Sequence, residues 1–271
     1  MPIVSRITIF PLKSGDPFSC AETKVNSSGA LQHDRQFALV DVTGRLINAN
    51  RAPLIQQLRI AIDPVRREFQ VAWREPKGAK VPSEQALPLF GQLDEHGRQL
   101  SDWLSQALGL EVSIAENVDT GFPDDLKANG PTIVSTATIE AVARWFPELI
   151  VDEIRRRFRA NIEVEGVDPF WEDRLFRADL EPQPFWIGST LFVGTNPCQR
   201  CAVPTRDSQT GEATPSGFAK RFSEQRQLSL PDWSPREHFD HYYRLTTNTK
   251  RTDQRIGVVR IGDTVEIVSS L

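Results

Sequence analysis

Cysteine is scarce in this sequence: the 271 residues contain Cys20, Cys198 and Cys201 and no other cysteine. An iron–sulfur cluster normally takes four cysteines, so the chain lacks the ligands for a cluster of its own. A structural zinc site needs about four protein ligands, and none of the four histidines forms a compact ligand pair with the cysteines. His238 and His241 are three residues apart and could share a helix face, which leaves zinc as an open alternative.

Long apolar runs are absent as well, since none approaches the roughly 20 residues that cross a bilayer. The first six residues lack the charged head, apolar stretch and small-residue cleavage site of a secretory signal. A formal net charge of −4 gives no global attraction to nucleic acid. We therefore expect a cytoplasmic protein with no membrane span and no nucleic-acid polymer as partner.

The N-terminal part is rich in strand signals. An imperfect alternation of apolar residues over 4–10 predicts an opening strand, and residues 37–47 resemble a hairpin whose Gly44 can take positive φ. Further strands are expected at 57–62 and 69–73. Together these segments predict a small antiparallel barrel or sandwich.

The segment after these strands has the apolar spacing of a helix. Apolar residues over 100–108 predict an amphipathic helix that ends at Gly109. The polar, turn-rich stretch 119–125 places a domain boundary there, which gives an N-terminal domain over 1–118 and a second domain over 119–271.

The second domain is expected to open with helices and to continue as a barrel. One helix is predicted to begin at Ser135 or Thr136 and to end before Pro147, and another to cover 152–158. Residues 185–193 resemble residues 259–267, and two similar Gly-centred corners suggest one barrel. The polar stretch 208–240 is expected to be an irregular excursion. The predicted fold class is mainly β with some α, with peripheral helices on the second barrel.

Two cysteines lie in a Cys-X-X-Cys pair at 198–201, which offers a soft, acidified sulfur ligand. The pair follows a β-rich run and precedes Val203 and Pro204, which argues against the helix start of a dithiol oxidoreductase. Cys198 is interpreted as structural, and Cys20, in a predicted loop, as inert.

Three short polar motifs occur at the ends of predicted strands, at residues 11–14, 33–35 and 158–161. Each supplies a cation or hydroxyl where the chain leaves a sheet, a geometry suited to gripping phosphate. Taken singly, each motif is typical of a solvated turn.

Together, these motifs and residues 200–211, which contain Arg-Cys-X-X-X-Thr followed by an aspartate and a glycine, resemble the MOSC superfamily. Within it the chain is similar to the mitochondrial amidoxime-reducing component and its YcbX-type relatives, which join an N-terminal β-barrel domain to a MOSC domain. The resemblance spans nearly the whole chain and ends in residues 259–265. Two departures are Ala160, where the family has proline, and Pro204, where relatives often have threonine.

The resemblance implies a molybdenum cofactor whose metal is bound by a pterin dithiolene and one protein cysteine, here Cys201. The residues that it implies for cofactor binding are Lys13, Ser14 and Arg35 at the phosphate, Arg159 and Asn161 at the pterin or phosphate, and Thr132, Ser135 and Thr205 along the cofactor. It also implies that Asp207 lies near the metal and relays protons or orients water.

The implied activity is reduction of N-hydroxylated compounds, such as amidoximes or hydroxylated nucleobases. YcbX-type relatives can continue into a plant-type ferredoxin domain, and this sequence ends without one. Electrons would then come from a separate ferredoxin-like, flavoprotein or cytochrome partner. Two alternatives remain: a cofactor carrier or sulfur-transfer module with a persulfide on Cys201, and a zinc-stabilised interaction domain.

Overall fold

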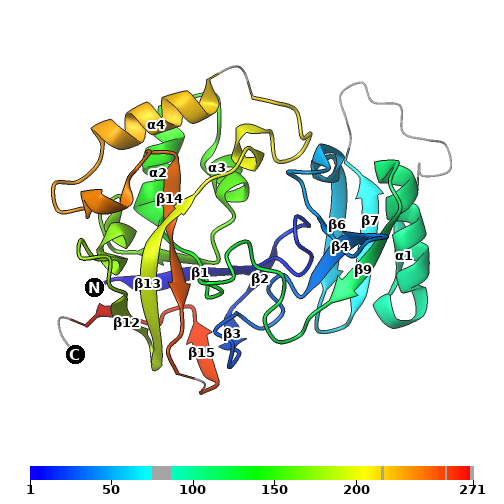
Figure 1. Ribbon diagram of the computed structural model, residues 1–271, viewed down its shortest axis with the longest axis horizontal. Helices are drawn as coiled ribbons and strands as arrows, with labels where there is room; N and C mark the ends of the chain where they lie inside the picture. The colour runs from blue at the N-terminus through cyan, green and yellow to red at the C-terminus, as the bar shows by residue number, and fades with distance from the viewer. Residues whose placement is uncertain (75–86, 215–216, 254, 269–271) are drawn as a thin grey trace.

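The computed structural model describes residues 1–74, 87–214, 217–253 and 255–268. Its elements form two β-rich bodies side by side, with helices α2, α3 and α4 on one body and helix α1 on the outer face of the other (Figure 1). The expected class, mainly β with some α, is confirmed.

The larger body is built on a sheet in which eight of the described strands follow one another. In spatial order they are β16 (Val265–Ile267), β12 (Gln183–Ile187), β13 (Thr190–Gln199), β14 (Arg244–Lys250), β10 (Ile133–Ser135), β11 (Ile162–Glu165), β1 (Ile3–Ile9) and β2 (Phe18–Cys20). Beside it, β3 (Glu22–Val25) pairs with β15 (Gly257–Arg260). The first and last of the described strands, β1 and β16, therefore belong to the same sheet.

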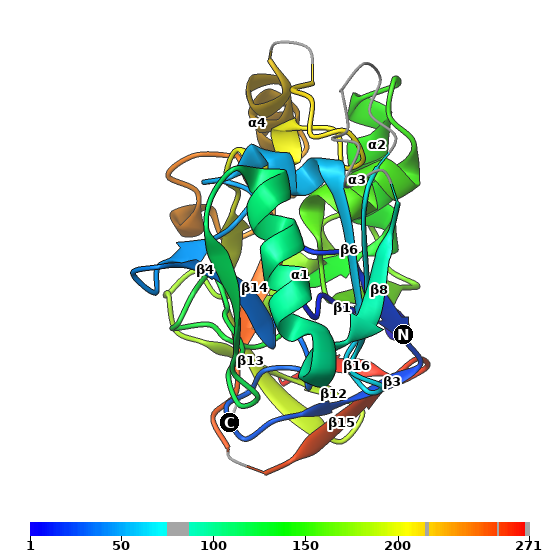
Figure 2. The same cartoon turned by 90° about the vertical axis from the view of Figure 1, so that its right-hand side faces the viewer.

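The smaller body contains two sheets of three described strands each and one long helix. The strands are β5 (Leu46–Ile47), β4 (Phe37–Asp41) and β9 (Val112–Glu116) in one sheet, and β6 (Leu58–Asp63), β7 (Glu68–Trp73) and β8 (Leu89–Gln92) in the other. Helix α1 (Leu93–Leu108) lies along these strands (Figure 2). It buries Leu100, Trp103 and Leu104 against them and ends at Gly109 with a φ of 62°, as its sequence predicts.

Three α-helices and several single turns complete the larger body. These are α2 (Thr136–Trp145), α3 (Val151–Phe158), α4 (Phe218–Leu228), and the 3₁₀ turns η3 (Trp171–Leu175), η4 (Val203–Thr205) and η5 (Arg236–His238). A further 3₁₀ turn, η1 (Pro53–Gln57), belongs to the smaller body, where its Ile55 joins the core. Helix α2 is capped by the Ser135 hydroxyl, which accepts a hydrogen bond from the Thr138 amide at 3.0 Å. The start and end predicted for α2 from Ser135 and Pro147 agree with this helix.

Three local expectations were wrong. The excursion 208–240 is not irregular throughout, because α4 lies in it and buries Phe218 and Phe222 against α2 and α3. Cys20 ends strand β2 instead of lying in a loop, and burial, followed by the charge of Asp34, raises the pKa of its thiol. The opening strand β1 pairs with β11 of the larger body, so it is not part of the small first barrel.

The imperfect alternation of the first strand has a structural cause. Val4 pairs with Val164, but the next partners are Arg6 and Glu163, so the register shifts by a bulge between them. A bulge puts two residues of one strand opposite one residue of the other and turns the following side chains to the other face.

No helix in the described part of the chain has the length and hydropathy to cross a membrane.

A buried carboxylate under α2 leads to a pH prediction. One oxygen of Glu172 accepts hydrogen bonds from the Ser135 amide at 3.2 Å and the Thr138 hydroxyl at 3.0 Å, and the other has no partner among the described residues. Burial, followed by the charge of Asp173, raises the pKa of Glu172 to about 7. The folded protein therefore holds a proton that the unfolded chain releases near its ordinary pKa of 4.5.

The free energy of unfolding should therefore decrease as pH rises from 4.5 through about 7, because the folded state binds more protons in that window. Glu172→Gln should match the wild type near pH 4.5 and exceed it by up to about 3 kcal/mol above pH 7. Urea unfolding across this range measures the difference, with the exposed Glu140→Gln as control. A stability difference that does not change with pH contradicts the prediction.

Candidate functional site

The three short polar motifs come together around the ring of Phe10. The guanidinium of Arg159 lies over this ring at 3.9 Å from its centroid, and that of Arg35 at 5.4 Å. Arg159 also donates to the carbonyl of Gly15 at 2.8 Å. The charges of Arg35 and Arg159 both act on Lys13. Lys13, Arg35 and Arg159, which lie far apart in the sequence, therefore form one group of cations.

Asn161 holds these segments together. Its side-chain oxygen accepts hydrogen bonds from the Thr132 amide at 3.1 Å and hydroxyl at 3.2 Å, and from Arg35 at 3.5 Å. Its side-chain nitrogen donates to the carbonyl of Thr8 at 3.1 Å. The side chain is almost fully buried. In this structure Asn161 and Thr132 position the strand ends that present the cations.

The backbone is strained where these motifs lie. Ser14, Arg35 and Arg159 have φ of 68°, 51° and 52°, in the left-handed region that glycine usually occupies. Arg159 takes the position after α3 where glycine is common, and stacks on Phe10 there. Such strain costs of order 1 kcal/mol or more per residue and clusters at ligand sites. Three residues chosen from sequence motifs share this conformation.

The positive charges of the cation group repel one another, which affects the pKa values of its members. Burial, followed by the charge of Arg35, lowers the pKa of Arg159 to about 10. Burial also lowers the pKa of Lys13, with Asp124 opposing and the two arginines reinforcing this shift. Cations held together in this way favour an anion between them.

Asp124 is a partner that the sequence motifs did not reveal. It follows β9 on an exposed loop, and its carboxylate accepts a hydrogen bond from the Lys13 ammonium at 2.6 Å. Burial would raise its pKa, but the charges of Lys13 and Arg35 outweigh burial and hold the pKa below its ordinary value. The carbonyl of Phe122 accepts a second hydrogen bond from Lys13 at 2.9 Å. Asp124 lies in the polar, turn-rich stretch 119–125, which was used in the sequence analysis only to place a domain boundary.

The cysteine pair lies at the end of β13, close to the cation group: Cys198 is in the strand and Cys201 follows it. Arg200 donates to the sulfur of Cys198 at 3.3 Å and to the carbonyl of Phe158 at 2.7 Å, so it connects the pair to the end of α3. Cys201 is exposed. Burial raises the pKa of Tyr243, Arg200 opposes this shift and Cys201 reinforces it, so both lie within electrostatic reach of the phenol.

Two polar atoms near the cysteines lack partners among the described residues: the Nε of Arg200 and the hydroxyl of Tyr243, both buried. Buried polar groups normally have a hydrogen-bond partner, so such atoms indicate where another group could bind. Neither residue was selected from the sequence. For Arg200 the adjacent cysteine was the available signal, and Tyr243 had none.

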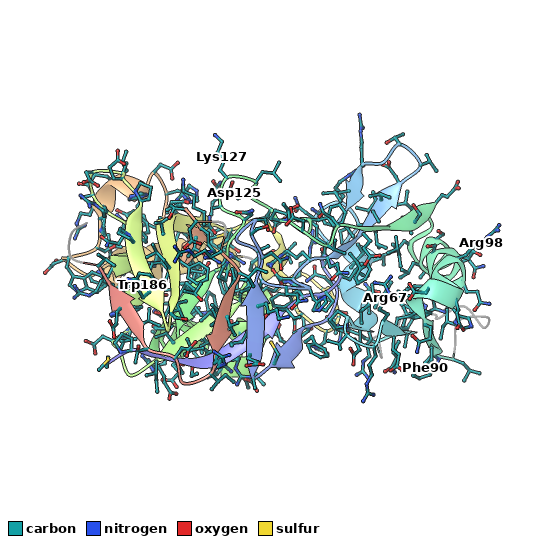
Figure 3. All side chains as sticks on the ribbon, turned by 90° about the horizontal axis from the view of Figure 1, so that it is seen from below. Arg67, Phe90, Arg98, Asp125, Lys127 and Trp186 are labelled. Carbon is teal, nitrogen blue, oxygen red and sulfur yellow. The ribbon has the colours of Figure 1, made fainter. Side chains whose placement is uncertain are left out.

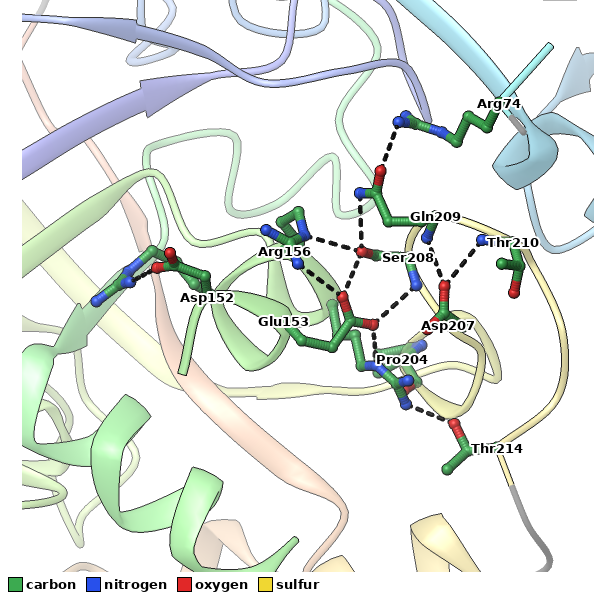
Figure 4. A network of polar contacts seen from close by, with 12 residues as sticks. Arg74, Asp152, Glu153, Arg156, Pro204, Asp207, Ser208, Gln209, Thr210 and Thr214 are labelled. Carbon is green, nitrogen blue, oxygen red and sulfur yellow. Dashed lines mark hydrogen bonds and ion pairs between the residues drawn. The ribbon is translucent and has the colours of Figure 1, made fainter. Parts of the chain in front are cut away.

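The loop after Cys201 is fixed by a polar network (Figure 4). The buried carboxylate of Glu153 accepts hydrogen bonds from the amide of Ser208 at 2.8 Å and its hydroxyl at 2.6 Å, and from Arg157 at 2.6 Å. Arg157 also donates to the carbonyl of Pro204 at 3.2 Å. Gln209 continues the network to Arg74 of the smaller body at 3.1 Å. Helix α3 therefore holds both Arg159 and the loop that follows the cysteines.

Two predicted site residues have structural roles in this loop. The carboxylate of Asp207 accepts from the amides of Gln209 and Thr210, both at 2.8 Å, and these bonds outweigh burial to lower its pKa. The hydroxyl of Thr205 donates to the carbonyl of Ala202 at 2.7 Å. Their roles at a metal or cofactor stay predictions.

A cavity of about 340 Å³ adjoins the cation group. Ser14 and Arg159 line it, together with Val203 of the loop after the cysteines, whereas Lys13 and Arg35 do not. Ser14 also accepts a hydrogen bond from the Ala49 amide at 3.0 Å. Ser135 is placed differently from the other predicted residues, because its fully buried hydroxyl caps α2.

Comparison with family models confirms the expected arrangement of an N-terminal barrel domain followed by a MOSC domain. The family model "MOSC N-terminal beta barrel domain" matches residues 1–153, and "MOSC domain" matches residues 132–266. The chain therefore belongs to the MOSC family, a molybdenum cofactor-binding family. The two matches overlap, and the boundary between residues 118 and 119 stays a prediction.

Among curated proteins the chain is similar to several named "Molybdenum cofactor sulfurase". That of Drosophila mojavensis is 27% identical over 79% of this chain and 29% of its own length. That of Caenorhabditis briggsae is 26% identical over 80% and 31%, and that of Bos taurus 23% over 84% and 29%. The chain thus spans less than a third of each of these relatives. A solved structure, the YUAD protein from Bacillus subtilis, aligns over 98% of this chain and 96% of its own, with a TM-score of 0.36 and 12% identity.

Proposed function

We propose that the chain binds a molybdenum cofactor at this site and reduces N-hydroxylated compounds with it. The main support is the unbalanced charge of the cation group. The cations that lie together there, among the described residues, are Lys13, Arg35, Arg159 and Arg200, with Arg74 beside Arg159 on the same cavity. The carboxylates that face them are those of Asp34, Asp124 and Asp16, the last paired with Arg74. Five cations against three carboxylates leave two positive charges, which a phosphate dianion would neutralise.

The donor set fits such a cofactor. A pterin phosphate would take the cations of Lys13, Arg35 and Arg159 as charge-assisted donors. The exposed thiol of Cys201 is a soft ligand suited to a dithiolene-bound metal. The unpartnered Nε of Arg200 and the unpartnered hydroxyl of Tyr243 offer hydrogen-bond donors, and the charge of Arg200 acts on both Asp124 and Tyr243.

When bound, the cofactor would supply two-electron redox chemistry at the N–O bond of the substrate. The balanced reaction takes two electrons and two protons, cleaves the N–O bond, and yields the reduced nitrogen compound and water. The chain's own residues would hold the cofactor, and Asp207 is proposed to move a proton or orient water. A separate electron-donor protein would restore the reduced state.

Metal and pterin analysis of the full chain, purified from a host that makes the cofactor, tests the proposal. We expect about one molybdenum and one pterin per chain, and reduction of an amidoxime when an artificial donor supplies electrons. Lys13→Met should lower the pterin content, because a buried donor to the phosphate is lost. Protein without molybdenum and pterin contradicts the proposal.

A second candidate is sulfur transfer, in which Cys201 bears a persulfide without N-reductive turnover. The relatives named molybdenum cofactor sulfurase favour it, and so does the exposure of Cys201. Intact-mass measurement distinguishes the two functions: the sulfur carrier should show a mass increment of one sulfur that thiol treatment removes. The reductase should show no such increment and should retain its metal.

A further inference from the structure

The carboxylate of Asp124 has the chemistry of a ligand. It is an oxygen anion that accepts a short hydrogen bond from Lys13 and lies in the field of Arg35 and Arg200. Lys13, Arg35 and Arg200 come from three segments of the chain that are otherwise distant in sequence. Their convergence on one oxygen anion matches the way a protein grips a phosphate group.

Asp124 differs from the groups it neutralises in how it is held. The Lys13 side chain is 6% exposed, whereas that of Asp124 is 80% exposed, although the protein around its carboxylate partly desolvates the end that meets Lys13. Because most of the side chain already faces solvent, the carboxylate regains hydration when it leaves the ion pair. The Lys13 ammonium cannot follow it to solvent and needs another anion in its place.

The loop backbone is anchored independently of the Asp124 side chain. The amide of Phe122 donates to the carbonyl of Arg35 at 2.9 Å. Gly121, with φ of 61°, packs so closely that a Cβ there would lie 2.5 Å from the carbonyl oxygen of Asp34. Rotation of the Asp124 side chain therefore suffices to vacate its place on Lys13, with the loop held in position.

We propose that Asp124 is an internal competitor for the phosphate site, in which its carboxylate occupies Lys13 until a phosphate monoester dianion displaces it. The inference rests on the proposed function for the identity of the physiological ligand and concerns how that site is regulated. Before loading, Asp124 stabilises a group of like charges that would otherwise repel. On loading, the dianion takes over that role, and Asp124 turns to solvent.

Calorimetric titration of inorganic phosphate into the full chain, produced without cofactor and kept at low ionic strength, tests the inference. Asp124→Asn should bind phosphate roughly threefold to tenfold more tightly than the wild type, because the competing charge is gone. Asp124→Ser should do the same. Without phosphate, both variants should unfold at a lower temperature than the wild type, and phosphate should raise their Tm by more.

Two further variants locate the effect. Asp125 and Lys127 project outward from the same loop (Figure 3), and the Asp125 carboxylate accepts from the Lys127 amide at 2.8 Å. Asp125→Asn removes the same charge from the neighbouring position and should leave phosphate affinity at the wild-type value. Lys13→Met combined with Asp124→Asn should lose the gain.

Phosphate that binds Asp124→Asn no more tightly than the wild type overturns the inference, as does a gain that survives the loss of Lys13. The titration needs neither metal nor turnover. Failure to find molybdenum in the loaded protein would therefore count against the proposed function and leave this result unchanged.

Discussion

Replacing Cys201 by serine is expected to lower both molybdenum retention and N-reductive turnover by at least about 100-fold. A thiolate is a soft ligand that matches a dithiolene-bound metal, whereas an alkoxide is hard and its parent hydroxyl stays protonated near neutral pH. The fold should be unaffected, because Cys201 is exposed at the start of the loop. We expect its free energy of unfolding to change by less than about 0.5 kcal/mol.

Cys198→Ser is the matched control, three residues away. The sulfur of Cys198 accepts a hydrogen bond from Arg200, a role that a hydroxyl can take over. We expect less than about a tenfold loss of molybdenum for this variant. Elemental analysis and turnover with an artificial donor measure both proteins. Equal losses in the two variants, or metal retained by Cys201→Ser, contradict the assignment of Cys201 as the ligand.

Part of this site could be predicted because its chemistry is local in the sequence. Lys13 follows β1, Arg35 precedes β4 and Arg159 follows α3, so their motifs mark them as side chains presented beside regular elements. The positive φ angles of Arg35 and Arg159 could not be predicted, because a motif of residue types contains no information on φ. The structure adds that the motifs meet on a single aromatic ring, that of Phe10.

The parts that the sequence did not reveal depend on contacts between distant segments. Asp124 and Lys13 are far apart in sequence, and only the path of the loop after β9 brings them together. Tyr243 immediately precedes β14, the strand that pairs with β13, and nothing about a single tyrosine there indicates a site. The pairing of β1 with β11 was missed for the same reason, because strand signals give no partner. Local periodicity predicted α2 and the C-terminal part of α1, because the apolar spacing and the cap of each lie within one segment. The start of α1 at Leu93 was not predicted.

Gly194→Ala is expected to destabilise the fold by more than about 3 kcal/mol, because a backbone would have to move. Gly194 lies in the middle of β13, and a Cβ placed on it would be 1.6 Å from the carbonyl oxygen of Leu175. Leu175 ends η3 and is fully buried. The neighbouring backbone carbonyl cannot rotate away as a side chain could, so the strand and η3 would have to separate.

Urea unfolding of the variant and the wild type measures this cost from the midpoint and slope. Gly97→Ala is the matched control, because Gly97 lies inside α1 with nothing within 4 Å of an added Cβ. That change should raise stability by up to about 1 kcal/mol through helix propensity. A Gly194→Ala protein as stable as the wild type would contradict the prediction, because it would show that β13 and η3 can separate without cost.

Because β13 leads directly into the cysteine pair, any Gly194→Ala protein that does fold should also bind molybdenum less well than its stability alone predicts.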